Sequence, residues 1–143
     1  MNFSTHADIG EAFVQELAKE LGCPGEVEKA GRILRSTLHV YRDHSTPQES
    51  IALLGELPLF IKAVYVDGWT DRGNGDPLSD LHDFAARVRT VESLCSDGDL
   101  KSDDESLSAI KAVFRIIRKH ITDDEEVAHL EQTLPAGLRS LLA

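Results

Sequence analysis

The sequence predicts an all-α fold: two tandem pseudo-repeats of about four helices each, packed as one helical bundle. Apolar residues recur every three or four positions along nearly the whole chain, which is the spacing of one helix face. Helix-start and helix-stop residues bracket these apolar stretches. The two halves also match each other at a fixed offset, which is typical of an internal duplication. No segment alternates apolar and polar residues for long enough to predict a strand.

The first predicted helix begins near an Asp-x-x-Glu capping pair formed by Asp8 and Glu11, and it ends at Gly22. Its apolar positions recur every fourth residue, which places them on one face. These positions are Ile9, Phe13, Leu17 and Leu21.

The second helix carries an apolar stripe of the same kind. Its members are Val27, Ala30, Leu34, Leu38 and Tyr41. The third helix starts at Thr46-Pro47-Gln48-Glu49, where threonine is the N-cap and proline takes the first helical position. It is short, and its apolar residues are Ile51, Leu53 and Leu54.

Pro58 ends the third helix and opens a fourth, whose buried face is predicted to hold Phe60, Ile61 and Val64. Gly68 is placed to supply the left-handed residue that follows a helix C-cap. Trp69 would then fold back on Val64.

The second half of the chain repeats this organisation. A fifth helix carries Leu81, Phe84, Ala85, Val88 and Val91. A capping box at residues 102–105 precedes a sixth helix with Leu107, Ile110, Phe114, Ile117 and Ile121. Another box, starting at Thr122, opens a seventh helix with Val127 and Leu130. Leu134-Pro135 then leads into a final short helix with Leu138, Leu141 and Leu142.

A constant offset aligns the two halves without a gap. It places Ile33 on Ile110 and the pair Leu57-Pro58 on Leu134-Pro135. Upstream, Phe13 pairs with Phe84 at a shorter offset, so the second copy carries an insertion within the acidic segment 95–106.

We therefore predict a single helical domain over residues 1–143. Its first repeat covers about 8–69, and its second repeat covers about 78–143. The polar, glycine-containing segment over about 70–77 is the predicted linker between them.

Charge and length restrict the partners. The chain has 143 residues and a formal net charge of −10, from 25 acidic and 15 basic residues. This negative field repels nucleic-acid phosphates and anionic membrane surfaces, so we expect neither nucleic acid nor a membrane as a partner. The longest apolar stretch, residues 57–66, is interrupted by Lys62 and is far shorter than a membrane-spanning helix.

The amino-terminal segment shows neither the basic nor the apolar region of a secretory signal. Cys23 and Cys95 are the two cysteines, and their wide separation does not form a disulfide framework. These features predict a cytoplasmic protein.

Motifs of catalysis and metal binding do not stand out. The histidines lack the His-x-x-x-His and His-Glu-x-x-His spacings of zinc sites. The spacing of Arg115 and His120 is similar to that in HEPN-type ribonucleases, but Ile116 replaces the polar residue that follows the arginine. The acidic loop from Asp97 has a lysine where an EF-hand needs an oxygen donor. We therefore expect no catalytic residue, no metal and no cofactor.

Structural needs explain Leu57-Pro58, which recurs in the second half, but they explain Trp69 only in part. Tyr65 and Trp69 have no aromatic counterparts in the second copy. Trp69 is therefore either a packing residue at the end of its helix or part of a binding surface. The candidate binding surface consists of Tyr65, Asp67 and Trp69.

Several motifs in order give the chain a family resemblance. They are "YRDHST" followed by Glu49, then "LLGELPLFIKAVYVDGW", a polar linker, "FAARV" and "LEQTLPAGLRSLL". With these, the chain resembles DUF2267, a bacterial family of unknown function, over roughly residues 10–143. The resemblance implies an all-helical, two-repeat fold, and it implies no activity and no functional residues.

The sequence favours a non-enzymatic protein-interaction module that binds an unidentified protein partner, and it allows a homo-oligomer. The alternative is a small-molecule binder or an enzyme that uses a cleft between the repeats near Tyr65 and Trp69. A ligand cleft would gather convergent polar groups in an apolar pocket. An interaction module would instead expose an apolar patch.

Overall fold

A computed structural model describes residues 1–70, 75–95 and 98–143, and within these ranges every regular element is a helix. The predicted all-α fold is confirmed. The elements are α1 (Phe3–Glu20), α2 (Val27–Asp43), α3 (Pro47–Leu54), α4 (Leu59–Val66), α5 (Leu81–Cys95), α6 (Asp103–His120), α7 (Asp124–Thr133) and a closing 3₁₀ helix, η1 (Ala136–Leu142). None of the helices described is both long and apolar enough to cross a bilayer.

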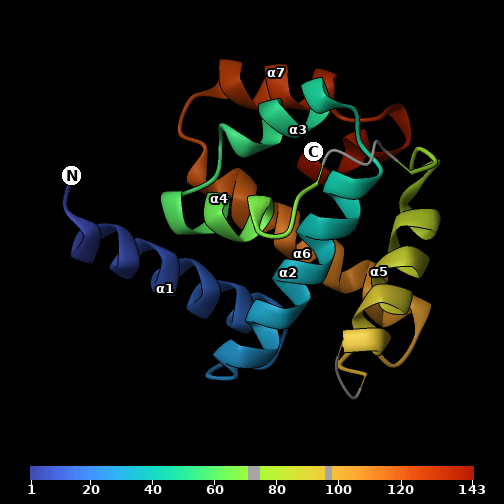
Figure 1. Ribbon diagram of the computed structural model, residues 1–143, viewed down its shortest axis with the longest axis horizontal. Coiled ribbons are helices and arrows are strands. Elements are labelled where there is room, and N and C mark those ends of the chain that lie inside the picture. The colour runs from blue at the N-terminus through green and yellow to red at the C-terminus, as the bar shows by residue number, and fades with distance from the viewer. Residues whose placement is uncertain (71–74, 96–97) are drawn as a thin grey trace.

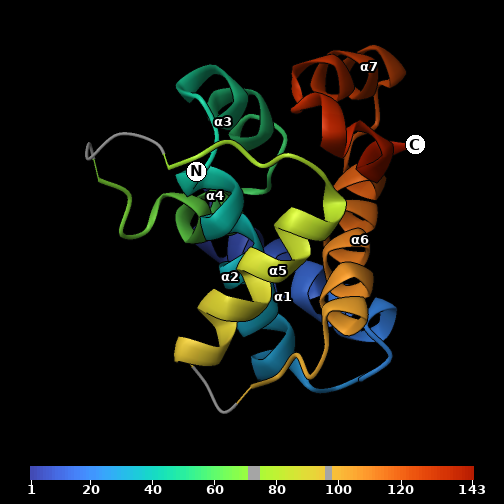
Figure 2. The same cartoon turned by 90° about the vertical axis from the view of Figure 1, so that its right-hand side faces the viewer.

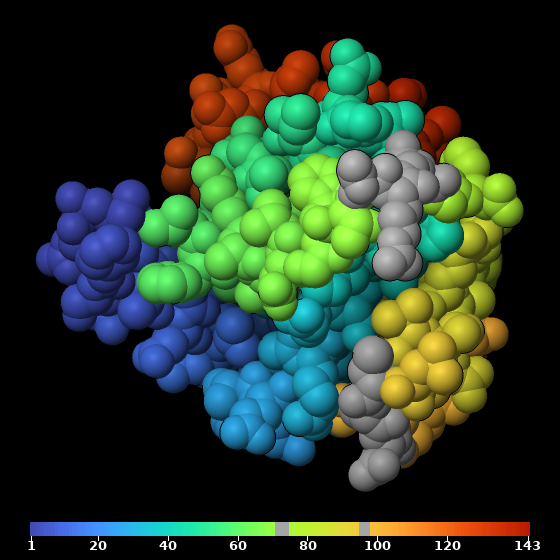
Figure 3. Space-filling view, in the orientation of Figure 1, coloured from blue at the N-terminus to red at the C-terminus, as the bar shows by residue number. Residues whose placement is uncertain are grey.

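Two long helices, α2 and α6, pack against each other and against most of the other elements. The α1 helix packs against α2, α4 and α6, and α5 packs against α2 and α6. The α3 and α7 helices lie together at one end in both views (Figures 1 and 2). The amino-terminal half of α1 projects from one side of the body next to α4 (Figures 1 and 3).

Aromatic rings join the two halves of the chain at the core. Tyr41 from α2 lies 6.3 Å from Phe84 of α5 and 6.0 Å from Phe114 of α6, measured between ring centroids. Phe84 and Phe114 meet edge to face at 6.1 Å. All three side chains are fully buried, so the two halves share this part of the core.

Two of the predicted helix starts are confirmed. At α3 the Thr46 hydroxyl accepts from the Glu49 N–H at 3.2 Å, and the Glu49 carboxylate accepts from the Thr46 N–H at 2.7 Å. At α6 the Ser102 hydroxyl accepts from the Glu105 N–H at 3.0 Å, while the Glu105 carboxylate accepts from the Lys101 N–H instead of that of Ser102. These contacts satisfy N–H groups that have no partner within the helix.

Two other predicted starts were wrong. The α1 helix begins at Phe3, because Asn2 caps it by accepting from the Thr5 N–H at 3.2 Å. Nothing between Asn2 and Asp8 breaks a helix, so the helix continues upstream of the predicted cap. The α7 helix is capped by Asp123 and not by Thr122. Aspartate is the better N-cap of the two.

The predicted duplication agrees with the helix bounds but stays a prediction. At the offset that places Ile33 on Ile110, the helices α2, α3 and α4 fall on α6, α7 and η1 with nearly the same ends. Residues 71–74 of the predicted linker lie outside the described residues. Beyond them, Gly75 donates its N–H to the Asp43 carbonyl at 2.8 Å.

Candidate functional site

The three residues predicted as a binding surface lie at the end of α4. Tyr65 is fully buried, and its hydroxyl donates a 2.7 Å hydrogen bond to the Ser50 hydroxyl. Burial raises the pKa of Tyr65 to about 12, so the phenol stays protonated at neutral pH. Asp67 is exposed and lies 2.8 Å from the Arg35 guanidinium, which holds the pKa of the Asp67 carboxyl below its usual range. Of the three, Asp67 and Trp69 remain accessible.

The end of α4 explains the placement of Trp69. Gly68 adopts a φ of +75°, as its predicted role requires. Trp69 donates its N–H to the Val66 carbonyl at 3.0 Å. Its ring lies edge-on to Tyr65 with centroids 5.9 Å apart, whereas the sequence predicts a contact with Val64. Trp69 is 38% exposed, so it is a packing residue on one side and a surface residue on the other.

We expect Trp69→Ala to lower the free energy of unfolding by about 2 kcal/mol. This is less than the ~3–5 kcal/mol of a fully buried tryptophan, because part of the ring is already in water. Trp69→Phe keeps an aromatic edge on Tyr65 and should cost less than half as much. Urea unfolding followed by circular dichroism measures both variants. A loss below about 0.5 kcal/mol for the alanine variant would make Trp69 a surface residue only.

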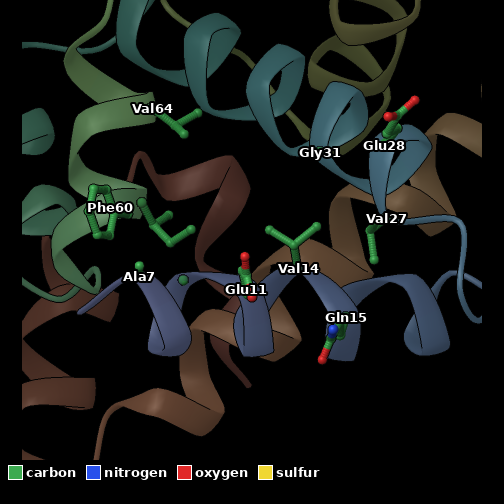
Figure 4. A pocket seen from close by; sticks show the side chains of 11 residues that line it. Ala7, Glu11, Val14, Gln15, Val27, Glu28, Gly31, Phe60 and Val64 are labelled. Carbon is green, nitrogen blue, oxygen red and sulfur yellow. The ribbon is translucent and has the colours of Figure 1, made fainter. Parts of the chain in front are cut away.

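An open apolar groove lies between α1, α2 and α4. Its volume is about 620 Å³, which is in the range of known binding pockets. Val14 of α1, Val27 of α2 and the α4 residues Phe60, Ile61 and Val64 line it. Figure 4 shows Phe60 and Val64 on one side and Val14 and Val27 across from them. All three lining helices belong to the first half of the chain, so this groove is not the inter-repeat cleft considered from the sequence.

The α1 and α4 helices meet at a glycine that lines the groove, Gly10. A Cβ on Gly10 would lie 3.1 Å from the Phe60 Cβ, so the two helices approach closely at this point. Ile61 is buried and lines the groove from α4, whereas Phe60 is 39% exposed and Val27 38% exposed. The prediction that Phe60 lies on a buried face was therefore wrong. Large apolar side chains remain open to solvent on either side of the helix contact.

The charge at the groove is negative. Glu11 of α1 points into the space between α4 and α2, and Glu28 lies on α2 at the edge (Figure 4). Across the described ranges neither carboxylate forms an ion pair. On the opposite side of α1, Glu16 and Glu20 are paired with basic residues of α6.

His39 lies behind the α4 side of the groove. Its Nε2 donates to the carbonyl of Val64 across a distance of 2.6 Å, which fixes the tautomer because a carbonyl only accepts. Burial lowers the pKa of His39, and the charges of Arg42 and Arg35 act in the same direction. The hydrogen bond to Val64 and the charge of Asp43 oppose this shift without cancelling it.

The lowered pKa of His39 makes stability depend on pH. His39 has an ordinary pKa of 6.5 when unfolded, so above that pH both states hold neutral imidazole and the contribution is complete. As the pH falls from 6.5 through the lower folded pKa, the unfolded state takes up the proton first and stability is lost. We expect His39→Gln, which can still donate to Val64, to lose less stability between pH 7.5 and 5.5. Chemical unfolding at several pH values measures this, and parallel curves for the two proteins would contradict it.

Arg115 and His120 of α6 both contact glutamates of α1. Arg115 lies 3.6 Å from Glu20, and His120 lies 3.5 Å from Glu16. The His120 ring also packs on Phe13, with centroids 5.0 Å apart. These contacts dock α6 onto α1.

The acidic segment 95–106 is anchored to the body at Asp99. Residues 96 and 97 lie outside the described residues, as does the side chain of Cys95. The Asp99 carboxylate receives two hydrogen bonds from Arg32 of α2, at 2.8 and 3.1 Å. The buried carboxylate of Glu92 accepts from the N–H of Asp99 at 2.7 Å. Within the residues described, no group of three acidic, histidine or cysteine side chains is placed to hold a metal.

The chain matches the family described as an uncharacterized conserved protein (DUF2267) over residues 10–141. No curated protein matches the chain. The resemblance expected from the sequence motifs is therefore confirmed over almost the whole chain, and it comes with no activity, substrate or partner.

Proposed function

The chain belongs to the DUF2267 family, and because the description of that family assigns no activity, we propose from the shape of its surface that the protein is a non-enzymatic protein-interaction module. The observation that carries this proposal is the solvent-open apolar groove between α1, α2 and α4. Exposed and contiguous apolar surface of this kind marks sites where other macromolecules bind.

The lining of the groove supports protein binding over catalysis. Small-molecule and catalytic sites combine an apolar wall with several convergent polar groups. Here the walls are mainly Val14, Val27, Phe60 and Val64, and Glu11 is the polar side chain that points inward (Figure 4). Gln15 and Glu28 also line the groove, but one inward-pointing carboxylate gives little specificity for a small polar substrate.

The alternative of a ligand cleft near Tyr65 and Trp69 has less support. The Tyr65 hydroxyl is committed to Ser50 and buried, so it offers no hydrogen bond to a ligand. Asp67 is paired with Arg35. Trp69 retains an exposed edge, which suits an auxiliary contact with a protein partner.

Quantitative affinity capture from cells that encode the protein tests the function. The bait is the intact chain, compared with the double variant Val27→Gln/Phe60→Gln. A matched control, Ile51→Gln/Leu94→Gln, makes the same chemical change at apolar residues that are 66% and 82% exposed on α3 and α5. Circular dichroism and thermal unfolding confirm that each variant folds.

We expect at least one protein to be captured by the parent and by the control, and to be depleted with the groove variant. Metabolites in the same eluates are analysed in parallel. Identical protein profiles for all three baits would contradict the proposal, as would a groove-dependent metabolite with no accompanying protein.

A further inference from the structure

We infer that the groove between α1, α2 and α4 docks an amphipathic helix of a partner protein that carries basic residues beside its apolar face. This inference rests on the interaction function proposed above and adds the chemical class of the partner. Three features carry it: the dimensions of the groove, the exposure of its apolar side chains, and the unpaired carboxylates at its edges.

The dimensions suit a short helix. The α1 wall extends from Ala7 to Gln15, which at 1.5 Å per residue is about 12 Å, or a little more than two helical turns. A helix that lies in such a groove places anchors at positions i, i+3 or i+4, and i+7. The exposed faces of Val27 and Phe60 are the receptors for these anchors.

The carboxylates give the sign of the partner's charge. On the α6 side of α1, Glu16 and Glu20 are paired with Lys119 and Arg115. On the groove side, Glu11 forms no ion pair with any described residue, and the same holds for Glu28.

The nearest arginines of α2 do not neutralise the negative charge at the groove. Arg32 is paired mainly with Asp99, and the charge of Glu28 acts on it more weakly. Arg35 is paired with Asp67. The negative charge at the groove is therefore left for a partner, and Lys or Arg on the flanks of the docked helix would complement it.

A second copy of this chain is a poorer occupant. Each copy has a formal net charge of −10, and a contact through this groove would bring the Glu11 and Glu28 edges toward another acidic surface. Like charges across an interface weaken association. The same field disfavours the anionic surface of a membrane.

Synthetic peptides test the partner class on the intact protein. The probe is a fluorescein-labelled peptide of about five helical turns, with leucines on one helical face and lysines and arginines beside them. One comparison peptide has glutamates in place of the basic residues, and another has the basic composition in scrambled order. Fluorescence anisotropy at low and high salt measures the affinities.

We expect saturable, salt-sensitive binding of the basic amphipathic peptide and at least roughly 10-fold weaker binding of the other two. Glu11→Gln/Glu28→Gln should weaken the basic peptide by about 5-fold at low salt, and Val27→Gln by a similar factor. The controls Glu125→Gln on α7 and Ile51→Gln on α3 should leave its affinity unchanged.

Several outcomes would overturn the inference. Equal binding of basic and acidic peptides would show that the groove does not select a basic partner. Concentration-dependent self-association that Val27→Gln abolishes would show that a second copy occupies the groove. If no peptide binds while cellular capture remains groove-dependent, the partner class is wrong and the interaction function stands. If neither peptide binding nor capture depends on the groove, both proposals fail.

Discussion

Gly137→Ala is expected to lower the free energy of unfolding by about 3 kcal/mol, a large effect for one added methyl group. Gly137 lies in η1, directly against the chain that leads into α5. A Cβ at this position would lie 2.9 Å from the Ser79 carbonyl carbon and 3.0 Å from the Asp80 Cα. These are backbone atoms and have no alternative rotamer, so the helix itself must move. Overpacking of this kind costs roughly 1–3 kcal/mol, and more when the neighbours are rigid.

Gly31→Ala is the matched control. Gly31 lies inside α2, with open space where a Cβ would be added. The same substitution there should stabilise the protein by roughly 0.5–1 kcal/mol, because alanine is the better helix former. Urea unfolding of the two variants should therefore give shifts of opposite sign. Equal shifts, or a loss at Gly137 below about 0.5 kcal/mol, would show that η1 does not contact the Ser79–Asp80 backbone as described.

Arg42→Met is expected to destabilise by a similar amount, about 3 kcal/mol. The Arg42 side chain is 5% exposed, and its Nη1 donates to the carbonyls of Tyr65 and Asp67, each at 2.8 Å. These carbonyls lie at the carboxyl end of α4, which carries the negative end of the helix dipole. Methionine fills much of the volume but cannot donate. Two carbonyls on the buried side would then lose a charged donor, and the exposed Asp43 carboxylate would lose its hydrogen bond from the Arg42 Nε. Hydrogen bonds to charged groups contribute about 1.5–3 kcal/mol each.

The control for Arg42 is Arg35, which lies two turns earlier on α2. Its side chain is 51% exposed, and it pairs with the exposed carboxylate of Asp67. Arg35→Met should change stability by less than about 1 kcal/mol, as is usual for surface ion pairs. Arg42→Lys should fall between the two, because lysine keeps the charge without the forked geometry. Equal losses for Arg35→Met and Arg42→Met would contradict the buried role of Arg42.

The helices could be predicted from the sequence because their signals are local. The capping box at Thr46, the left-handed Gly68 and the stripe through Phe84 and Val88 each depend on residues a few positions apart. The two helix starts that were predicted wrongly also depend on residues close in the sequence. At α7 adjacent residues compete for the cap, and Asp123 prevailed over Thr122.

The groove could not be predicted, because it depends on how α1 crosses α4. The predicted stripe placed Ile9 on the inner face of α1, whereas Ile9 is 40% exposed and Gly10 is buried. The small residues Ala7 and Gly10 followed by Val14 were a usable signal, since small residues let helices approach closely. The buried contacts of Arg42 could not be predicted either. Its carbonyl partners lie at the carboxyl end of α4, 23 and 25 residues further along the chain.

NMR mapping of the bound peptide on the protein tests most directly whether the groove docks a basic amphipathic helix. Uniformly ¹⁵N-labelled protein is titrated with the basic amphipathic peptide, and backbone amide shifts are followed. We expect saturable changes concentrated at residues 7–15 of α1, 27–31 of α2 and 60–64 of α4, with α3 and α7 unaffected. Changes centred on α3, α7 or α5, or no changes at saturating peptide, would contradict it.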